Sequence, residues 1–326
     1  MDGTTRLSWG LVSTAQISAD VIPGLQRSPK NQLIGVASRD GVKGAEFARA
    51  NNIPQAFDSY DAMLEDPAVD CVYIPLPNHL HAQWTRRAIL AGKHVLCEKP
   101  FVADPSDAAA LFTLADVRGV HLAEAFMYRH HPKTHALKTI VESGTLGDIH
   151  TIRAWFTYSA RDAATDVRFQ PGMEGGALRD VGSYPVSMCN YLLDSEPSSV
   201  TSRMVCDANG IDERFYGIMN YANDVVAVFD CSMRSQPGYG VTVIGHAGTA
   251  SLACPWYSHK PPDYLEVTTA MGTERITPDR AENAYFLETE NFADVVTGAA
   301  DPEITAEETI RTMRTLARLI RSASNT

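Results

Sequence analysis

The sequence shows no concentration of positive charge. Its 326 residues include 28 lysines and arginines against 39 aspartates and glutamates, which gives a net charge of −11 at pH 7. Nucleic acids and anionic membranes attract basic surfaces, so this balance argues against both as partners.

Long apolar runs and paired cysteines are missing as well. No stretch approaches the roughly 18 consecutive apolar residues that cross a bilayer, and the first ten residues, MDGTTRLSWG, lack the apolar core of a secretion signal. The six cysteines are scattered without a CxxC pair, which argues against structural zinc. Free thiols are typical of a reducing compartment, so we expect a cytoplasmic protein.

Length and pattern predict two domains, since single domains commonly run about 100–200 residues. Residues 1–125 alternate strand-like and helix-like patterns, with strands expected at 7–12, 32–38, 69–74, 94–97 and 121–125. Short connections between alternating strands and helices favour an α/β fold, so we predict a doubly wound parallel sheet of the Rossmann type.

From Ile149 onward the apolar pattern changes. Apolar residues alternate at strand spacing from Ile152 to Tyr158, and strand-like runs follow at 200–206, 215–221, 225–233, 240–244 and 265–269. Strands that succeed one another through short turns predict an open, largely antiparallel sheet. A final helix, opened by the capping-box pair Thr305 and Glu308, completes an α+β domain over residues 126–326.

The stretch Val69–Pro100 is the most informative part of the sequence. Its pattern predicts a strand, a helix over 81–91, a turn at Gly92 and a second strand that leads into Glu98-Lys99-Pro100. Open parallel sheets bind ligands outside the carboxyl ends of their strands, and Lys99 is expected at such an end. Lys99 is therefore a candidate charge or hydrogen-bond donor for a substrate; the alternative is an ordinary surface lysine.

The turn after the first strand is the expected phosphate-binding position. A dinucleotide fold places the pattern G-x-G-x-x-G/A here, and Ser13, Ala15 and Ser18 stand at its three glycine positions. All three are small residues, so the backbone can still approach a pyrophosphate closely. The N-terminus of the following helix would favour that anion.

The tip of the second strand is where a dinucleotide fold reads the nucleotide type. An acidic residue there binds a ribose 2′-hydroxyl, whereas an arginine suits a 2′-phosphate. The sequence has Ser38-Arg39 at this tip and Asp40 one place later. We predict NADP(H) as the cofactor, with NAD(H) as the alternative. If Arg39 does not read the nucleotide, it is a solvated charge in a turn.

A histidine pair and a carboxylate–tyrosine pair are the remaining candidates. His130 and His131 are adjacent, so they point in different directions, and no carboxylate cluster accompanies them; we predict no metal site. Asp180 and Tyr184 are four residues apart, which on a helix directs both to one side. The alternative makes Asp180 a helix cap and Tyr184 a core residue.

Three segments together resemble one known family. AGKHVLCEKP, residues 91–100, resembles the AGKHVxxEKP signature of the Gfo/Idh/MocA family of nicotinamide-dependent oxidoreductases. EAFMYRHHP, residues 124–132, resembles the EAxxYRxxP stretch of its sugar-dehydrogenase and dihydrodiol-dehydrogenase branches. Residues 174–185 resemble its GGGALxDxGxY segment, although Glu174 stands at the first glycine. The resemblance covers nearly the whole chain.

The resemblance implies a catalytic group of Lys99, Asp180 and Tyr184. A phenol in water has a pKa of about 10. A neighbouring ammonium favours the phenolate, so Lys99 would bring the pKa of Tyr184 closer to working pH. Tyr184 would exchange a proton with the substrate hydroxyl while hydride passes to or from nicotinamide, and Asp180 would orient the substrate or Lys99. Whether Lys99 or Tyr184 is the immediate proton donor stays open.

The resemblance also implies the residues that bind the two ligands. The cofactor residues are Ser13, Thr14, Ala15, Gln16, Ile17, Ser38, Arg39, Leu76, Pro77, Asn78, His81, Glu98, Lys99 and Arg168. The substrate residues mix aromatic faces with hydrogen-bonding groups, as a sugar ring requires; they are Tyr128, Arg129, Phe156, Tyr158, Phe169, Asp180 and Tyr184.

The leading hypothesis is an NADP(H)-dependent oxidoreductase that acts on a secondary alcohol or carbonyl of a D-xylose- or glucose-type sugar or related cyclic polyol. The alternatives are a trans-1,2-dihydrodiol dehydrogenase, a nucleotide-sugar ketoreductase and, from another class, a non-catalytic nucleotide-sensing regulator. Members of the resembled family pair their C-terminal sheets, so we expect a homodimer or homotetramer.

Overall fold

The computed structural model describes residues 6–160, 165–257, 260–278 and 282–324. They form two compact units. The first unit contains the described residues up to Val102 together with Ser106–His130 and Asn283–Ala306, and the second contains Ala103–Pro105, His131–Glu282 and the described residues from Glu307. The predicted boundary after residue 125 lies close to His130, whereas the pattern contained no sign that a late segment returns to the first unit.

The first unit is built on a six-stranded parallel sheet with strand order β3-β2-β1-β4-β5-β6. The strands are β1 Leu7–Val12, β2 Asn31–Ala37, β3 Gln55–Phe57, β4 Cys71–Ile74, β5 His94–Glu98 and β6 Leu122–Ala125. This order is the doubly wound arrangement, which confirms the predicted Rossmann fold. The predicted pattern lacked β3, because a strand of three residues is too short to show a periodicity.

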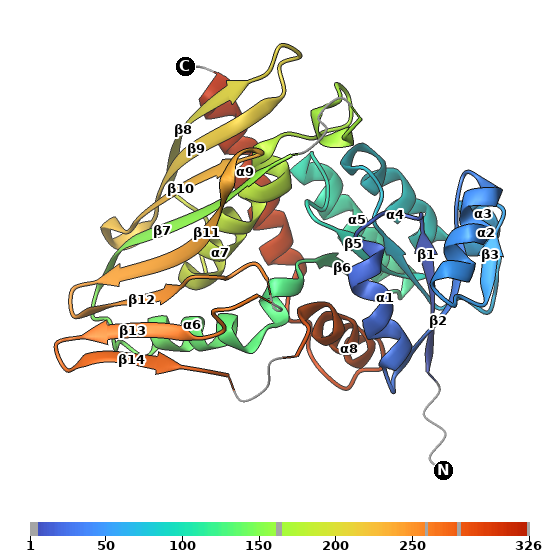
Figure 1. The fold of residues 1–326 in the computed structure, drawn as a ribbon, viewed down its shortest axis with the longest axis horizontal. Helices are drawn as coiled ribbons and strands as arrows, with labels where there is room; N and C mark the ends of the chain where they lie inside the picture. Colours follow the sequence, from blue (N-terminus) through green and yellow to red (C-terminus); the bar gives the residue numbers. More distant parts are fainter. Residues whose placement is uncertain (1–5, 161–164, 258–259, 279–281, 325–326) are drawn as a thin grey trace. The chain divides into compact units, whose positions relative to one another are not determined.

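Helices flank this sheet, and one of them comes from the far end of the sequence. They are α1 Ser18–Arg27, α2 Gly41–Ala50, α3 Tyr60–Glu65, α4 His81–Leu90, α5 Pro105–Arg118 and α8 Ala284–Val296. Figure 1 shows α8 beside α1, and an added Cβ at Gly24 of α1 would lie 3.2 Å from the Phe286 Cα. The rings of Trp9 and Phe292 are 5.0 Å apart, so α8 is part of the first unit's core.

The second unit is built on an eight-stranded sheet with strand order β14-β13-β12-β11-β7-β10-β9-β8. The strands are β7 Ile149–Ser159, β8 Ser199–Cys206, β9 Asp212–Asn220, β10 Val226–Ser232, β11 Arg234–Gly245, β12 Gly248–Leu252, β13 Leu265–Thr269 and β14 Gly272–Ile276. Strands β7 and β10 pair in parallel and the other neighbours pair antiparallel, which confirms the predicted open, largely antiparallel sheet.

Helices cover one face of this second sheet. They are α6 Pro132–Glu142, α7 Ser183–Leu193 and α9 Ala306–Ser324 (Figure 1). On β7, Ile152, Ala154 and Phe156 are buried on that face, while Arg153 points the other way and is exposed. The helix predicted at the end of the chain is α9, and its residues Met313 and Leu316 are buried.

The segment before α7 has an unusual backbone. Residues Leu178–Gly182 form a π-helical turn that continues directly into α7. Such turns are rare and occur mostly at functional sites. Glu174, just upstream, has φ 55°, in the left-handed region that favours glycine. No helix in the described part of the chain has the length and apolar character needed to span a bilayer.

The strain at Glu174 can be tested by substitution. We expect Glu174→Gly to raise the free energy of unfolding by about 0.5–1 kcal/mol, because relief of a left-handed non-glycine residue outweighs the extra freedom of glycine in the unfolded chain. Urea unfolding measures the change. The matched control is Glu46→Gly in the exposed part of α2, which should lower stability by about 1 kcal/mol. Equal losses from both substitutions would contradict the assignment of strain to Glu174.

Candidate active site

The first unit gathers its predicted ligand-binding loops at one edge of the parallel sheet. The segments 13–17, 38–39, 76–81 and 98–100 lie at or just after the carboxyl ends of β1, β2, β4 and β5. Parallel strands place these ends on the same side, so the edge combines the predicted cofactor residues of this unit. They are Ser13, Thr14, Ala15, Gln16, Ile17, Ser38, Arg39, Leu76, Pro77, Asn78, His81, Glu98 and Lys99.

The turn after β1 has the backbone of a glycine-rich loop without the glycines. Ser13, at the first predicted glycine position, has φ 128°. The Ala15 N–H donates to its Oγ at 3.1 Å, which holds this turn. Ile17 precedes α1 and has no side chain that could cap the helix. The first N–H groups of α1 donate to carbonyl oxygens of the preceding turn, and no side chain caps the helix.

Arg39 and Asp40, at the tip of β2, have different surroundings. Asp40 is the N-cap of α2 and accepts from the N–H groups of Val42 and Lys43 at 3.0 and 3.1 Å. The exposed Arg39 hydrogen-bonds the hydroxyl of Tyr60; burial raises the pKa of Tyr60, and the Arg39 charge opposes that rise. The carboxylate near the strand tip is thus committed to its own helix, while a guanidinium lies beside it.

Lys99 lies in a loop that is tied to the neighbouring strand. The Tyr73 hydroxyl of β4 donates to Glu98 Oε1, and the Lys99 N–H donates to Glu98 Oε2 at 3.2 Å. His81 is fully buried, and its Nε2 and Nδ1 lie 2.7 and 3.0 Å from the carbonyl oxygens of Leu76 and Pro100. His81 therefore joins the loops after β4 and β5, which positions Lys99 without contact between His81 and bulk solvent.

Tyr128 and Arg129 are buried in the first unit. They belong to the 3₁₀ turn Met127–His130, with exposed fractions of 1% and 3%. The rings of Tyr128 and Phe126 are 5.6 Å apart, and Arg129 Nη2 donates to the Glu303 carbonyl at 3.2 Å. The structure accounts for both residues by packing; their role in substrate binding remains a prediction.

Asp180, in the π-helical turn of the second unit, is held by two donors. The Tyr158 hydroxyl donates to its Oδ2 at 2.8 Å, and Arg168 Nε lies 3.1 Å from its Oδ1. Arg168 also pairs with Asp166 at 3.2 Å. Asp180 raises the pKa of Arg168, and burial together with Asp180 raises that of Tyr158, so a permanent cation and a neutral phenol face the carboxyl group of Asp180.

Tyr184 packs in a cluster of aromatic rings within the same unit. Its ring lies 5.3 Å from that of Phe156 and 5.6 Å from that of Trp256. Trp256 is fully buried and donates its indole N–H to the Trp155 carbonyl at 3.0 Å. Tyr257 continues the cluster, 5.8 Å from Phe156. Neither Trp256 nor Tyr257 was among the predicted site residues, although the aromatic pair PWY in a proline-rich loop was a visible signal.

Phe169, the remaining predicted substrate residue, is also packed. It is 2% exposed, and the guanidinium carbon of Arg234 lies 4.7 Å from its ring centre. The described residues contain no group of three or more histidine, cysteine, aspartate or glutamate side chains arranged to hold a metal ion.

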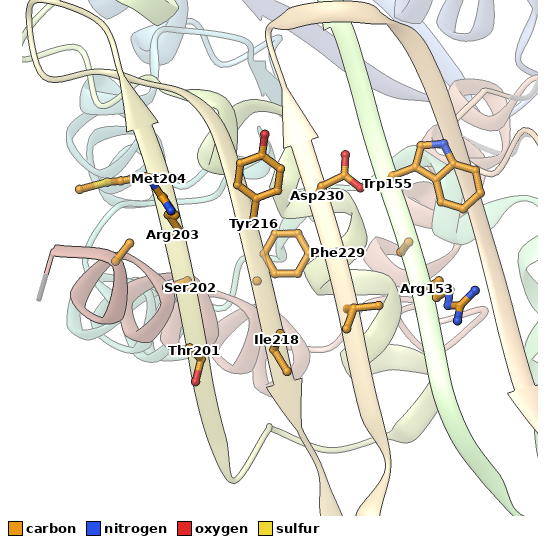
Figure 2. Close-up of a pocket in the computed structure, with 14 residues that line it drawn as sticks. Arg153, Trp155, Thr201, Ser202, Arg203, Met204, Tyr216, Ile218, Phe229 and Asp230 are labelled. Carbon is orange, nitrogen blue, oxygen red and sulfur yellow. The ribbon is translucent and has the colours of Figure 1, made fainter. Parts of the chain in front are cut away.

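A large hollow lies elsewhere in the second unit. It has a volume of about 970 Å³ and is formed by β7, β10, β9 and β8, as Figure 2 shows. Its lining includes Arg153, Trp155, Tyr216 and Asp230, and none of the predicted catalytic or cofactor residues. This hollow is therefore a feature of the sheet surface and distinct from the candidate active-site residues.

Comparison with protein families identifies both parts of the chain. Residues 7–126 match the GFO/IDH/MocA description "Oxidoreductase family, NAD-binding Rossmann fold". Residues 134–251 match the GFO/IDH/MocA C-terminal domain. The two matches together cover most of the sequence and confirm the resemblance seen in its motifs.

Similar proteins are named as dehydrogenases and reductases. D-xylose 1-dehydrogenase (NADP(+)) 2 of Haloferax volcanii is 35% identical over 325 residues, 97% of each chain. The trans-1,2-dihydrobenzene-1,2-diol dehydrogenase of Macaca fuscata fuscata is 32% identical over 252 residues, 76% of this chain and 75% of the other. The crystal structure of KijD10, a 3-ketoreductase of Actinomadura kijaniata in complex with NADP and TDP-benzene, has a TM-score of 0.88 at 27% identity and covers 98% of both chains.

The glycine-like turn after β1, the strand order of the first sheet and the two family matches all agree. The chain therefore belongs to the GFO/IDH/MocA family and is an NAD(P)-dependent oxidoreductase.

Proposed function

We propose that this oxidoreductase transfers a hydride between NADP(H) and one secondary alcohol or ketone carbon of an uncharged sugar or related cyclic polyol. The observation that carries the proposal is similarity over 97% of both chains to a D-xylose 1-dehydrogenase named for NADP(+). Fold alone does not identify a substrate, so the proposal depends also on the residues at the site.

The residues at the tip of β2 fit NADP(H) better than NAD(H). A guanidinium presents a planar set of donors that suits a phosphate. Arg39 is at the strand tip that contacts the ribose 2′ position in this fold. Asp40 accepts two backbone N–H groups through Oδ1 and so also serves as the cap of α2. The turn Ser13–Ile17 would hold the pyrophosphate, and the bound nicotinamide would accept or supply the hydride.

We assign the proton transfer to Tyr184 and Lys99. The assignment of Lys99 rests on its place in the family's EKP motif: an ammonium stabilises a phenolate, which would help Tyr184 to take or return the substrate proton. Asp180 is held by Tyr158 and Arg168, and we assign to it the orientation of the substrate or of Lys99. Because Arg168 is paired with two carboxylates, we assign it to anchor Asp180 rather than to bind the cofactor.

Arg39→Ala tests the cofactor assignment. We expect the dissociation constant for NADP(H) to rise about 10- to 150-fold, since a charge-assisted contact contributes about 1.5–3 kcal/mol. NAD(H) binding should change little, because NAD(H) has no 2′-phosphate. Nucleotide titration monitored by fluorescence measures both constants. The control is Arg49→Ala, which removes an exposed arginine from the end of α2. Equal weakening of both nucleotides in Arg39→Ala would refute the assignment.

A substrate screen with wild type and Tyr184→Phe tests the reaction. NADP⁺ reduction across aldoses, cyclitols and aromatic dihydrodiols should identify a neutral cyclic substrate. Tyr184→Phe should bind NADP(H) normally and lose about 100-fold or more in kcat, because a proton donor is removed; Lys99→Ala should lose at least as much. The control is Tyr264→Phe, whose ring lies against Arg275 on the far hairpin.

The same screen also tests the competing functions. The likeness to a ketoreductase crystallised with TDP-benzene favours a nucleotide-linked sugar as the second candidate. A kcat/KM about 100-fold higher for a phosphorylated or nucleotide-linked sugar, or about 2.7 kcal/mol of transition-state recognition, would replace the neutral substrate by that class. The non-catalytic regulator would be favoured by a different result. In that case no compound is turned over, and Tyr184→Phe and Lys99→Ala bind nucleotide as the wild type does.

We further propose that the open sheet face pairs with a second copy of this chain. The face opposite the helices exposes large apolar side chains, with Tyr216 42% and Ile218 44% exposed on β9. An open sheet face with exposed apolar side chains is a favourable surface for association of copies. Light scattering at micromolar concentration should give a dimer or tetramer, and Ile218→Arg should shift it toward monomer. Val117→Arg, on an exposed position of α5, is the control, and a monomeric wild type would contradict the proposal.

A further inference from the structure

Asp212 begins β9, yet its carboxylate is directed to the start of another element. Its Oδ2 accepts the N–H of Leu178, the first residue of the π-helical turn, at 2.8 Å. The N–H of Ala177 also hydrogen-bonds this carboxylate. The first N–H groups of a helix have no partner within it, and Ala177 has no side chain that could cap them. Asp212 supplies that cap from a neighbouring strand.

Two glycines allow this approach. Gly176 has φ 96°, and an added Cβ there would lie 1.8 Å from Asp212 Oδ1. An added Cβ at Gly175 would lie 2.1 Å from the Arg168 carbonyl oxygen, which accepts the Gly176 N–H at 3.0 Å. The segment is thus held between the carboxylate of Asp212 and the backbone of Arg168, with no room for a side chain on either glycine.

The turn that Asp212 caps carries Asp180 and continues into the helix that carries Tyr184. Asp180 lies in the π-helical turn Leu178–Gly182, and Tyr184 lies in the first turn of α7. Return of the turn to α-helical geometry would rotate Asp180 relative to Tyr184, since a π-turn contains one additional residue. The bond from Leu178 to Asp212 fixes the beginning of this turn, so it helps to set where Asp180 meets Tyr158 and Arg168.

We propose that Asp212 is a positioning residue for the reaction: its carboxylate holds the π-helical turn and thereby aligns Asp180 with Tyr184. The inference rests on the proposed roles of Asp180 and Tyr184. It adds a residue on β9 that touches neither substrate nor cofactor in the proposed mechanism.

The charge of Asp212 makes the proposal testable by pH. Burial raises its pKa to about 6, while the N–H groups of Leu178 and Ala177 and the charge of Arg179 oppose the rise. The titratable or charged groups that interact with it or flank it are Arg179 on the π-turn, Cys206 and Asp207 at the end of β8, Glu213 on β9 and Cys231 on β10. The carboxylate is ionised above about pH 6 and neutral below it. The bonds from the two N–H groups lower this pKa, so a turn that lost them while Asp212 stayed buried would have a higher pKa, and protonation therefore favours the uncapped turn. Charge-assisted hydrogen bonds are the stronger ones, so the cap weakens as the pH falls through this value.

Asp212→Asn is the decisive variant, because the amide keeps the shape and removes the charge. Hydrogen exchange of the peptide that covers residues 176–184 should become about 10-fold faster at neutral pH, after correction for intrinsic rates, as expected for a less stable local segment. With the best substrate of the screen, kcat should fall about 10- to 100-fold, as misplacement of catalytic groups predicts. NADP(H) affinity should stay unchanged, because the proposed nucleotide residues lie in the first unit.

The pH profile separates positioning from a purely structural role. Wild type should lose activity and exchange protection as the pH falls through about 6, and Asp212→Asn should show no such step. The matched control is Asp207→Asn, which removes a carboxylate from the adjacent turn, where it accepts the N–H groups of Asn209 and Ile211. It should retain the wild-type exchange rate and pH profile.

Three results would overturn the inference. One is wild-type exchange in Asp212→Asn; another is an acid limb near pH 6 that persists in this variant or is missing in wild type. The third is wild-type kcat in Asp212→Asn when Asp180→Asn and Tyr184→Phe are both impaired. If Asp180→Asn and Tyr184→Phe are themselves fully active, the proposed catalytic assignment is wrong. The exchange measurement would still decide whether Asp212 holds the turn.

Discussion

Parallel hydrogen bonding between β1 and its neighbours is the constraint on which the first unit depends. Each strand of a parallel sheet must return through a crossover, so every loop that follows a strand emerges at the same edge. Ser13, Arg39 and Lys99 are separated by many residues in the sequence, yet each follows the carboxyl end of such a strand. The geometry of the parallel sheet brings these residues to the same edge, which is the edge we propose for nucleotide binding.

In the second unit, polar groups lie beside an apolar sheet and need partners there. An isolated carboxylate in that setting would be costly, and Asp180 is stabilised there by Tyr158 and Arg168. Aromatic packing by Phe156 and Trp256 surrounds Tyr184. A polar anchor and an aromatic wall from one unit are a suitable combination for a ring-shaped substrate with hydroxyl groups.

Several residues with recognisable sequence signals serve the fold in ways that pattern alone did not reveal. His81, Tyr128 and Arg129 belong to segments expected to contact ligands, and the structure buries all three. His81 joins two loops through their carbonyl groups, and Arg129 contacts the backbone of a residue more than a hundred positions away. A motif marks where such residues occur, whereas burial depends on segments that the motif does not contain.

The sequence by itself determined the class of the fold, most strand positions, the family and the residue types at the nucleotide edge, because strand periodicity, turn residues and the EKP motif are local. It did not determine the short β3, the return of α8 to the first unit, the Trp256 contact with Tyr184, or the cap from Asp212 to Leu178. Strand β3 is too short to show a periodicity. The other three are contacts between segments distant in the chain, whose free energy arises only when both are packed together. Local pattern therefore identified the candidate chemistry, and tertiary packing decided which side chains hold it in place.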